Sequence, residues 1–425
     1  MHARAAVALT VVLAGCDPQS GERGPLGSLA VVLEPDGAIA WVDVASGDSR
    51  VVVAGPGPRG SLALSFDGAA IAFAAADDFA LNRSVFAVDV ASENVREVFP
   101  PTGAFMPSFE WLRSGWFSYP FDAGGAWRTA IVGPGQSEAR LIGTRNFARI
   151  DESPVTTAIA YMDCVVQMQG RCLLDLVIED PDGTNRVVLA TGVIGSTPRF
   201  TPDGLAVVYA AEVAGASHVM VQSISGGAAD DLGAGQPSTF LDYTSVPGGL
   251  RFSPSGEEVL TYRDGALVAL SLDGAGQRVI SEEWVRRAAF TGSGDVVFEL
   301  EINTEVPPDD TPEYEYSSFV VSPNGDIRPL RENDPTCELA HVAASGDYVA
   351  YSCADAPVHR IDGSHVVNAG GYYVLGFDKG EQGVVVADPS TTEVRYVPLD
   401  GGPPRVVSQF HSGAGGEWPP FAYAP

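Results

Sequence analysis

The chain has 425 residues, of which 45% are hydrophobic, with 48 glycines, 31 prolines and a formal net charge of −29 at pH 7. This charge argues against nucleic acid and anionic lipid surfaces as partners, because the protein's own field would repel both. The glycine and proline content favours many short strands joined by tight turns, and no long stretch of helical periodicity follows the N-terminus.

The first 15 residues are typical of a bacterial export signal. Residues 5–13 are apolar but too short to cross a bilayer, which takes about 20 residues. Residues 13–16 (LAGC) resemble the lipobox of bacterial lipoprotein signal peptides. The resemblance implies cleavage before Cys16 and a diacylglycerol thioether on the Cys16 sulfur. An ordinary signal peptide followed by a chance cysteine is the alternative.

A short polar segment separates this anchor from the rest of the chain. Its sequence, DPQSGERGPLG, is typical of a flexible tether. We therefore expect a lipoprotein signal peptide at 1–15, a lipidated cysteine with its tether at 16–27, and a folded domain at 28–425. The expected location is the bacterial cell envelope. The lipid would be the only attachment to the membrane, with the domain in the periplasm or on the cell surface.

Four cysteines remain after the anchor, and an even number in an exported chain predicts disulfides. Cys164 and Cys172 flank a polar tip between two apolar runs, as the two arms of one hairpin would. Cys337 and Cys353 flank a second segment of hairpin character. We therefore expect the local pairs Cys164–Cys172 and Cys337–Cys353. Free buried cysteines are the alternative, and metal ligation is disfavoured because no C-x-x-C pair is present.

Two kinds of turn recur along the chain and define a repeating unit. One places an aromatic residue and Ser or Thr before a turn ending in glycine and then an apolar strand, as at 200–204 (FTPDG) and 252–256 (FSPSG). The other is an Asp-Gly turn later in the unit, as at 180–183 and 273–274. Proline presets φ and glycine accepts positive φ, so both segments predict tight turns. The repeat is four short strands in roughly 35–50 residues, the spacing of propeller blades.

These motifs resemble the WD-repeat-like units of TolB-type β-propellers, which implies an all-β fold of four-stranded blades across residues 28–425. Sheets of this kind hide their apolar faces by stacking on one another radially. A literal count gives nine units, but two short ones within 339–408 could merge. We therefore predict eight blades, within a range of seven to nine. We expect the ring to be closed by strands from both ends of the chain, with residues 418–423 (WPPFAY) supplying the missing strand of the first unit.

A search for catalytic chemistry assigns no catalytic residue, no cofactor and no metal site. The chain has no G-x-S-x-G and no H-E-x-x-H. One acidic insertion at 305–316 (EVPPDDTPEYEY) carries Asp309, Asp310, Glu313 and Glu315, which we take as a candidate loop for a partner or for Ca²⁺. The insertion lacks the ligand spacing of a calcium loop, and a solvated charged loop is the alternative.

The expected function is a non-catalytic propeller that binds or scaffolds another envelope protein or ligand. If the protein acts as TolB-like proteins do, that ligand is an envelope protein, but this is an analogy of fold. The alternative is a glycan-acting hydrolase or lyase with its site at the channel mouth. Clustered carboxylates with perturbed pKa values, or a set of arginines at that mouth, would favour the enzyme.

Overall fold

The computed structural model describes residues 12–13 and 28–409, apart from a set of gaps. The gaps are 34–37, 45, 55–58, 66, 77–82, 100–108, 123–126, 144–149, 169–170, 194–197, 236–250, 305–312, 335, 344, 372, 379, 389 and 392. The named elements of the described part are all β-strands, which confirms the all-β prediction. Within the same residues, no helix has the length and hydropathy that crossing a membrane requires.

The strands fall into consecutive antiparallel sheets along the chain. The first three sheets are β1 (Val12–Leu13), β2 (Ser28–Leu33), β3 (Ala38–Asp43) and β4 (Ser49–Val53); β5 (Arg59–Leu64), β6 (Ala70–Ala76), β7 (Arg83–Asp89) and β8 (Asn94–Phe99); and β9 (Glu110–Trp111), β10 (Phe117–Asp122), β11 (Trp127–Val132) and β12 (Arg140–Ile142). The next three are β13 (Ile150–Glu152), β14 (Ile159–Met168), β15 (Arg171–Glu179) and β16 (Val187–Val193); β17 (Arg199–Phe200), β18 (Ala206–Val213), β19 (Ala216–Ser223) and β20 (Asp230–Ala234); and β21 (Glu258–Arg263), β22 (Ala266–Ser271) and β23 (Gln277–Ser281). The last three are β24 (Val285–Phe290), β25 (Val296–Thr304), β26 (Glu313–Val321) and β27 (Ile327–Asp334); β28 (Glu338–Val342), β29 (Tyr348–Ser352), β30 (Pro357–Arg360) and β31 (His365–Asn368); and β32 (Tyr373–Phe377), β33 (Gly383–Asp388), β34 (Glu393–Pro398) and β35 (Arg405–Gln409).

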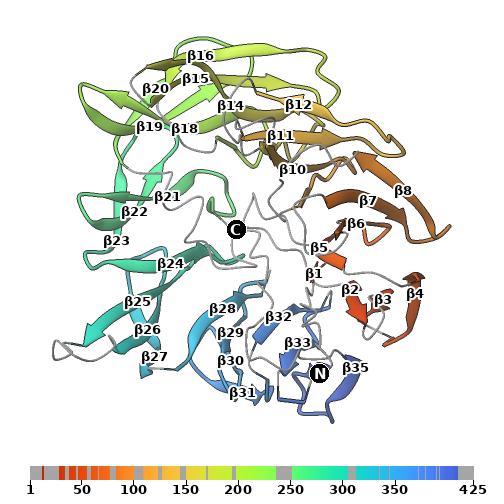
Figure 1. Cartoon of the computed structure of the whole chain (residues 1–425). Helices are drawn as coiled ribbons and strands as arrows, with labels where there is room; N and C mark the ends of the chain where they lie inside the picture. Colours follow the sequence, from red (N-terminus) through yellow and green to blue (C-terminus); the bar gives the residue numbers. More distant parts are fainter. Residues whose placement is uncertain are drawn as a thin grey trace.

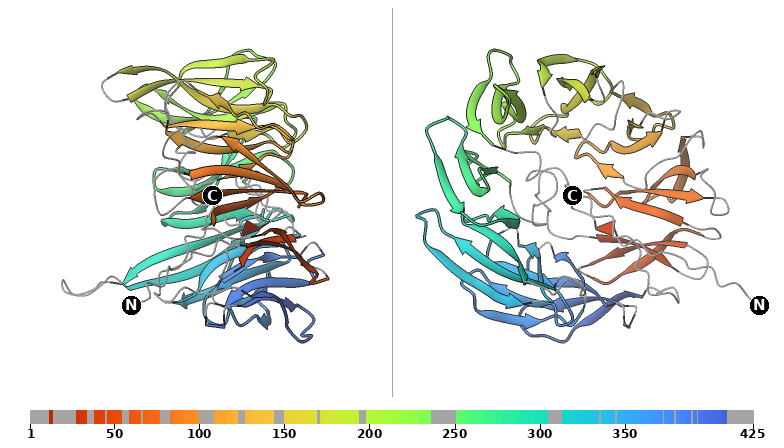
Figure 2. Two further views of the ribbon diagram at one scale, coloured as in Figure 1. Left: turned by 45° about the vertical axis from the view of Figure 1, so that its right-hand side comes forward. Right: turned by 60° about the vertical axis from the view of Figure 1, so that its left-hand side comes forward.

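These sheets follow one another around a ring, which is the predicted β-propeller (Figure 1; Figure 2). Each sheet places its first strand inside and its last strand outside, and first strands of adjacent sheets contact one another, as β13 and β17 do. Eight four-stranded blades are present, as predicted. In the described residues a three-stranded sheet, β21–β23, adds a ninth position to the ring. In this blade the innermost strand, which would precede β21, is reduced to a single bridge between Phe252 and Val259. The total therefore lies at the upper end of the predicted range, because the units within 339–408 do not merge.

The ring is closed by packing of the last sheet on the first. One buried cluster contains Ile39 and Val42 of the first sheet together with Leu375 and Val385 of the last. The guanidinium of Arg405 also donates a hydrogen bond to the carbonyl of Val44 across this seam. Apolar side chains of neighbouring sheets thus share one buried layer at the seam. Burial of this kind is worth about 25 cal/mol per Å² of apolar surface.

The fourth strand of the first sheet differs from our expectation. β1 pairs with β2 through Val12–Ala30 and Leu13–Leu29, and β1 belongs to the predicted signal peptide. The expected strand at 418–423 lies outside the described residues. Cleavage before Cys16 would remove β1 and leave this edge of β2 unpaired, so the C-terminal strand stays a prediction for the processed chain.

The order of strands gives the ring two different faces. The four strands of a blade are antiparallel and follow one another from the inside of the ring to the outside. The connection between the second and third strands therefore lies on the same face of the ring as the crossing from the fourth strand to the next blade. We call this the hairpin face; it carries the β14–β15, β18–β19, β21–β22 and β25–β26 hairpins. The opposite turn face carries the stereotyped tight turns. Loops that vary in length sit on the hairpin face, and such loops commonly carry function on a rigid scaffold.

The Pro-Asp-Gly turn at 202–204 shows why the turn face is uniform. Thr201 Oγ1 donates to Asp203 Oδ1 over 2.6 Å, and the same carboxylate oxygen accepts the Leu205 N–H at 2.9 Å. Gly204 has a φ of +67°, and a Cβ there would lie 2.3 Å from Cγ2 of Val155 in the preceding blade. Only glycine fits both the backbone angle and this close contact between blades. At this position the turn therefore packs directly against the preceding blade.

Both predicted disulfides are present, and both lie on the hairpin face. Cys164–Cys172 joins β14 to β15, and Cys337–Cys353 joins the residue before β28 to the residue after β29. The paired cysteines are separated by 8 and 16 residues, and loops of this size correspond to about 2.5 and 3 kcal/mol of stabilisation in the loop-entropy model.

We expect the double substitution Cys337→Ala/Cys353→Ala to lower the free energy of unfolding by about 3 kcal/mol, since it frees the longer loop in the unfolded chain. Urea titration of the oxidised wild type and the variant measures this difference. Reduction of the wild type should bring its midpoint down towards that of the variant. A variant as stable as the oxidised wild type would contradict a structural role for this disulfide.

Candidate functional site

The hairpin face contains a pocket of about 420 Å³ between two neighbouring sheets. One wall is the end of the β18–β19 hairpin, and the other is the end of the β21–β22 hairpin with the segment leading into β24. The pocket is lined by Gly215, Ala216, Ser217, Ala234, Gly235, Tyr262, Arg263, Asp264, Gly265 and Trp284. Polar and aromatic groups therefore converge in a concave site at a boundary between two blades, and such convergence is typical of small-molecule sites.

An aromatic stack forms one side of this pocket. The ring of Trp284 lies flat on the ring of Tyr262, with centroids 5.1 Å apart and planes 9° from parallel. Tyr262 is buried, and its hydroxyl donates to the carbonyl of Val285, directly after Trp284. Trp284 itself is 57% exposed. The buried tyrosine therefore holds a large aromatic ring at the surface, although exposing this ring to water is unfavourable.

Two very short turns hold the walls of the pocket. Both hairpins have two-residue turns, Ala214–Gly215 and Asp264–Gly265, in which every residue has a positive φ. This is the type I′ geometry that fits the twist of paired strands. This backbone geometry suits Asp-Gly, but at Ala214 a φ of 54° strains the backbone because alanine carries a Cβ. The exposed carboxylate of Asp264 stands at the rim beside Arg263, whose Nη1 donates to Gln277 Oε1 at 2.5 Å.

A charged cluster lies next to this pocket, at the inner strands. A β-bulge at Arg286 interrupts the pairing of β24 with β25, and bulges commonly re-aim a side chain. The Arg286 guanidinium lies 3.2 Å from Glu301 and 3.1 Å from Glu338, and it covers the Tyr316 ring at 4.9 Å. Glu338 also pairs with Arg287 at 3.0 Å. The cluster therefore gathers two arginines and two partly exposed carboxylates around the first strand of this blade, β24.

The innermost member of the cluster, Glu299, is fully buried. Its carboxylate accepts the N–H of Leu339 in the next blade and lies 3.8 Å from Arg286. Burial raises the pKa of Glu299 to about 7, and Arg287 together with the Leu339 N–H opposes this rise. A side chain with no exposed surface cannot reach a substrate. Glu299 therefore joins two blades, while Glu301 and Glu338 are the accessible carboxylates.

The raised pKa of Glu299 makes stability depend on pH. The folded protein binds this proton more tightly than the unfolded chain, whose glutamate has the ordinary value of 4.5. The stabilisation is complete below pH 4.5 and is lost as pH rises through 7, a change of about 3 kcal/mol. We expect Glu299→Gln to flatten the stability profile between pH 5 and 8, whereas Val279→Ala, which removes no titratable group from an exposed site, leaves the profile unchanged. Urea midpoints across this range measure the effect, and an equally steep profile in Glu299→Gln would contradict it.

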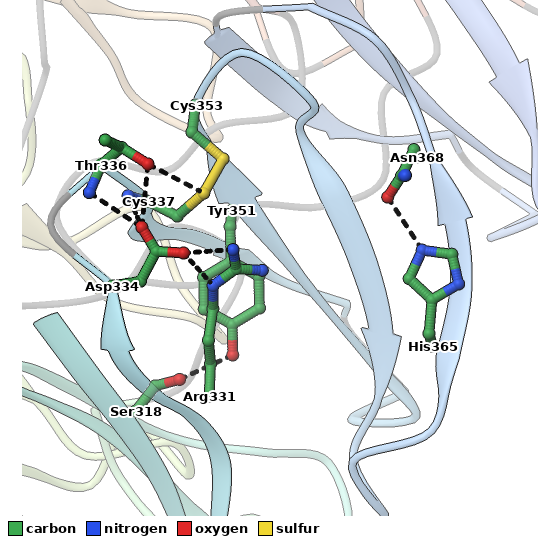
Figure 3. A network of polar contacts seen from close by, with 9 residues as sticks. All are labelled: Ser318, Arg331, Asp334, Thr336, Cys337, Tyr351, Cys353, His365 and Asn368. Carbon is green, nitrogen blue, oxygen red and sulfur yellow. Dashed lines mark hydrogen bonds and ion pairs between the residues drawn. A yellow bond between two sulfur atoms is a disulfide. The ribbon is translucent and has the colours of Figure 1, made fainter.

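The second disulfide sits in an ordered polar network at the crossing from β27 to β28 (Figure 3). Asp334 accepts hydrogen bonds from the N–H groups of Thr336 and Cys337, at 2.8 and 3.0 Å, and from Arg331 Nε at 3.0 Å. Burial opposes ionisation of Asp334, but these bonds outweigh it and hold its pKa below the ordinary value. The network fixes the chain around Cys337.

The β14–β15 hairpin places apolar side chains in solvent beside the other disulfide. Val165, Val166 and Leu173 are 52%, 48% and 40% exposed, and Val165 is the bulge residue between paired Cys164 and Val166. A covalent crosslink between Cys164 and Cys172 stiffens this hairpin close to its end. An apolar group on a rigid projection is typical of a surface that another protein covers.

The candidate acidic loop is not assembled as a loop of four carboxylates. Glu313 and Glu315 lie in strand β26, paired with Thr304 and Ile302 of β25, because the two arms of this hairpin extend beyond the usual blade height. Asp309 and Asp310 lie outside the described residues, as does Cys16. In the described part of the chain, no three of the His, Cys, Asp and Glu residues come close enough to hold a metal ion.

The pocket and the Arg286 cluster were missed by sequence reasoning. Trp284 and Arg286 flank the start of a strand in an ordinary crossing between blades, and their partners come from other strands or from the next blade. The available signals were the Asp-Gly hairpin at 264–265 and the run of a tryptophan and two arginines at 284–287 (WVRR). Neither signal predicts a pocket or a charged cluster by itself, because the residues that complete each of them come from distant parts of the sequence.

Comparisons with known proteins address the fold. No family profile and no curated protein sequence matches the chain. Among solved structures, it is similar to TolB from Acinetobacter baumannii, with 19% identity and a TM-score of 0.29 over 52% of this chain and 62% of that one. It is similar to dipeptidyl peptidase 4 from Porphyromonas gingivalis, with 12% identity and a TM-score of 0.56 over 86% and 60%. It also matches the β-propeller domain of the Trilobed protease from Pyrococcus furiosus, with 11% identity and a TM-score of 0.41 over 97% and 100%.

The chain thus spans about three fifths of the first two proteins, and identities this low concern the fold alone. By its fold the chain is a β-propeller.

Proposed function

We propose that the protein is a lipid-anchored lipoprotein of the bacterial envelope whose non-catalytic propeller binds another envelope protein through the hairpin face. The observation that carries the proposal is the β14–β15 hairpin, with its disulfide and its exposed Val165, Val166 and Leu173. Two disulfides are consistent with an exported protein. The lipobox-like segment ending at Cys16 supports the anchor.

The negative charge of the chain disfavours strongly acidic proteins as partners. At a net charge of −29, association with another strongly acidic surface is unfavourable. A partner for the hairpin would offer an apolar groove with a neutral or basic rim. The acidic hairpin β25–β26 on the same face, with Glu315 in its second strand, would add attraction to such a rim.

Affinity capture from envelope extract tests the proposal when the lipidated protein is compared with two matched variants. Val165→Arg places a charge on the hairpin, and Val279→Arg places the same charge on a valine of similar exposure, 50%, in the outer strand β23. We expect wild type and Val279→Arg to retain the same envelope protein in stoichiometric amount, and Val165→Arg to lose it. Equal recovery by all three proteins, or recovery of nothing, would contradict the proposed contact.

The Arg286 cluster favours a second candidate, a glycan-acting hydrolase or lyase at the channel mouth. Its accessible carboxylates, Glu301 and Glu338, are both engaged by Arg286, which reduces their capacity to act as an acid and a base. Incubation with neutral and acidic polysaccharides, followed by an assay for new reducing ends and unsaturated products, separates the two functions. Product formation that is lost in Glu338→Gln would establish the enzyme.

A further inference from the structure

The pocket beside Trp284 has the features of a ligand site that the proposed protein partner does not use. It lies at the boundary of the sheets β17–β20 and β21–β23, whereas the exposed valines belong to the β14–β15 hairpin of another blade. We propose that this pocket binds one pyranose unit of a neutral glycan, with the sugar ring stacked on Trp284. This proposal deepens the proposed function. It rests on that function in one respect, that the hairpin face is the surface that binds ligands and partners.

The aromatic geometry supports a flat, partly apolar ligand. One face of the Trp284 indole is covered by Tyr262 in a parallel stack, so the opposite face is the one available to a ligand. The face of an aromatic ring is electron-rich and attracts the slightly positive C–H groups on the flat side of a pyranose. Because Tyr262 is buried and hydrogen-bonded to the carbonyl of Val285, the platform is fixed before a ligand arrives.

The remaining walls supply groups that hydrogen-bond hydroxyls. Asp264 and Arg263 stand on the β21–β22 turn, and Ser217 comes from β19 on the opposite wall. The lining thus includes a carboxylate, which accepts hydrogen bonds, and a guanidinium and a hydroxyl, which donate them, and sugar hydroxyls can bond to either kind of group. Gly235 lies on the pocket wall, and a Cβ there would come within 2.8 Å of Cγ2 of the buried Val219, so this position of the wall favours glycine.

Electrostatics select a neutral sugar over an acidic one. The pocket lining contains one carboxylate, of Asp264, and one guanidinium, of Arg263, and Arg263 is already bonded to Gln277 at 2.5 Å. The protein as a whole carries −29 charges, and its field lowers the local concentration of polyanions. A volume of about 420 Å³ falls within the size range of small-molecule sites, and one or two sugar units fit such a space.

Calorimetric titration of the mature, disulfide-bonded protein with cellohexaose, chitohexaose and hexagalacturonate tests the proposal. We expect one of the neutral oligomers to bind in the micromolar to millimolar range and hexagalacturonate not to bind. Trp284→Ala should weaken binding by about tenfold or more, and Trp284→Phe should recover part of it. Ala216→Phe fills the pocket from the wall opposite Trp284 and should abolish binding without disturbing Tyr262. Val279→Ala, at an exposed site elsewhere, is the control.

Three results would overturn the proposal. One is no binding of either neutral oligomer by a folded wild type, and another is binding of hexagalacturonate alone. The third is neutral binding that persists in both Trp284→Ala and Ala216→Phe, which would put the site elsewhere. Failure here is distinguishable from failure of the proposed function, because Val165→Arg should lose the captured protein and keep the sugar, while Trp284→Ala should do the reverse.

Discussion

Replacing Cys16 with serine is expected to abolish lipid attachment completely and to move the protein from the membrane fraction to the soluble fraction. The predicted anchor is a thioether on the Cys16 sulfur, for which the serine hydroxyl does not substitute. Two buried acyl chains hold a protein to a bilayer because each buried CH₂ contributes about 0.8 kcal/mol. The apolar run at 5–13 is too short to span a bilayer and so would not replace them.

Metabolic labelling with an alkyne fatty acid, followed by detergent phase partition, measures this effect. The wild type should carry the label and enter the detergent phase. A matched control removes a cysteine pair elsewhere: Cys164→Ser/Cys172→Ser should keep both properties. A Cys16→Ser protein that still takes the label or partitions with the wild type would show that the anchor is not at this residue.

Asp151→Ala is expected to lower the free energy of unfolding by about 3–5 kcal/mol, because it breaks a buried ion pair between two blades. Asp151 on β13 and Arg199 on β17 are 5% and 2% exposed, and Asp151 Oδ1 lies 3.2 Å from Arg199 Nη1. The other carboxylate oxygen accepts the N–H of Phe200 at 2.6 Å. Removing the carboxylate leaves a buried guanidinium and a buried N–H without this partner, and both losses are costly.

Two variants show whether the loss comes from the broken pair. The double variant Asp151→Leu/Arg199→Met removes both charges and should recover much of the stability, since an apolar pair of similar volume often replaces a buried ion pair. Asp182→Ala, at an exposed turn, should lower stability much less than Asp151→Ala, because its carboxylate is solvated in the folded protein. Urea unfolding gives all three values. If the urea midpoint of Asp151→Ala is close to that of Asp182→Ala, the Asp151–Arg199 pair does not stabilise the contact between β13 and β17.

The predictable part of this molecule is the part that repeats. The turns at 201–204 and 253–256 have the same local hydrogen bonds because both make the same reversal on the turn face, so local residues suffice to predict them. The disulfides were predictable for the same reason: each joins the arms of one local unit. The number of blades was harder to predict, because the short units at 338–368 and 373–409 separate only through packing on their neighbours.

The candidate site depends on contacts that form only when the ring is complete. The stack of Trp284 on Tyr262 joins a crossing segment to the end of a strand in the preceding sheet. Glu299 and Leu339 meet because β25 and β28 belong to adjacent blades. Glu315 was expected in a loop, but the hairpin arms continue pairing as far as Glu313. Hydrophobic alternation predicts each strand, yet it carries no information about which blades stand side by side or how far a hairpin extends.

Site-specific photocrosslinking in bacterial cells tests most directly whether the hairpin face is the working surface. A photoreactive residue would replace Val165 or Asp264 on the hairpin face, and Asp182 or Ser255 on the turn face of the same two sheets. We predict a crosslinked envelope species of constant mass from Val165, no such species from Asp182 or Ser255, and a signal at Asp264 only if the partner extends to the pocket. Crosslinks of equal yield from both faces, or from the turn face alone, would contradict the account.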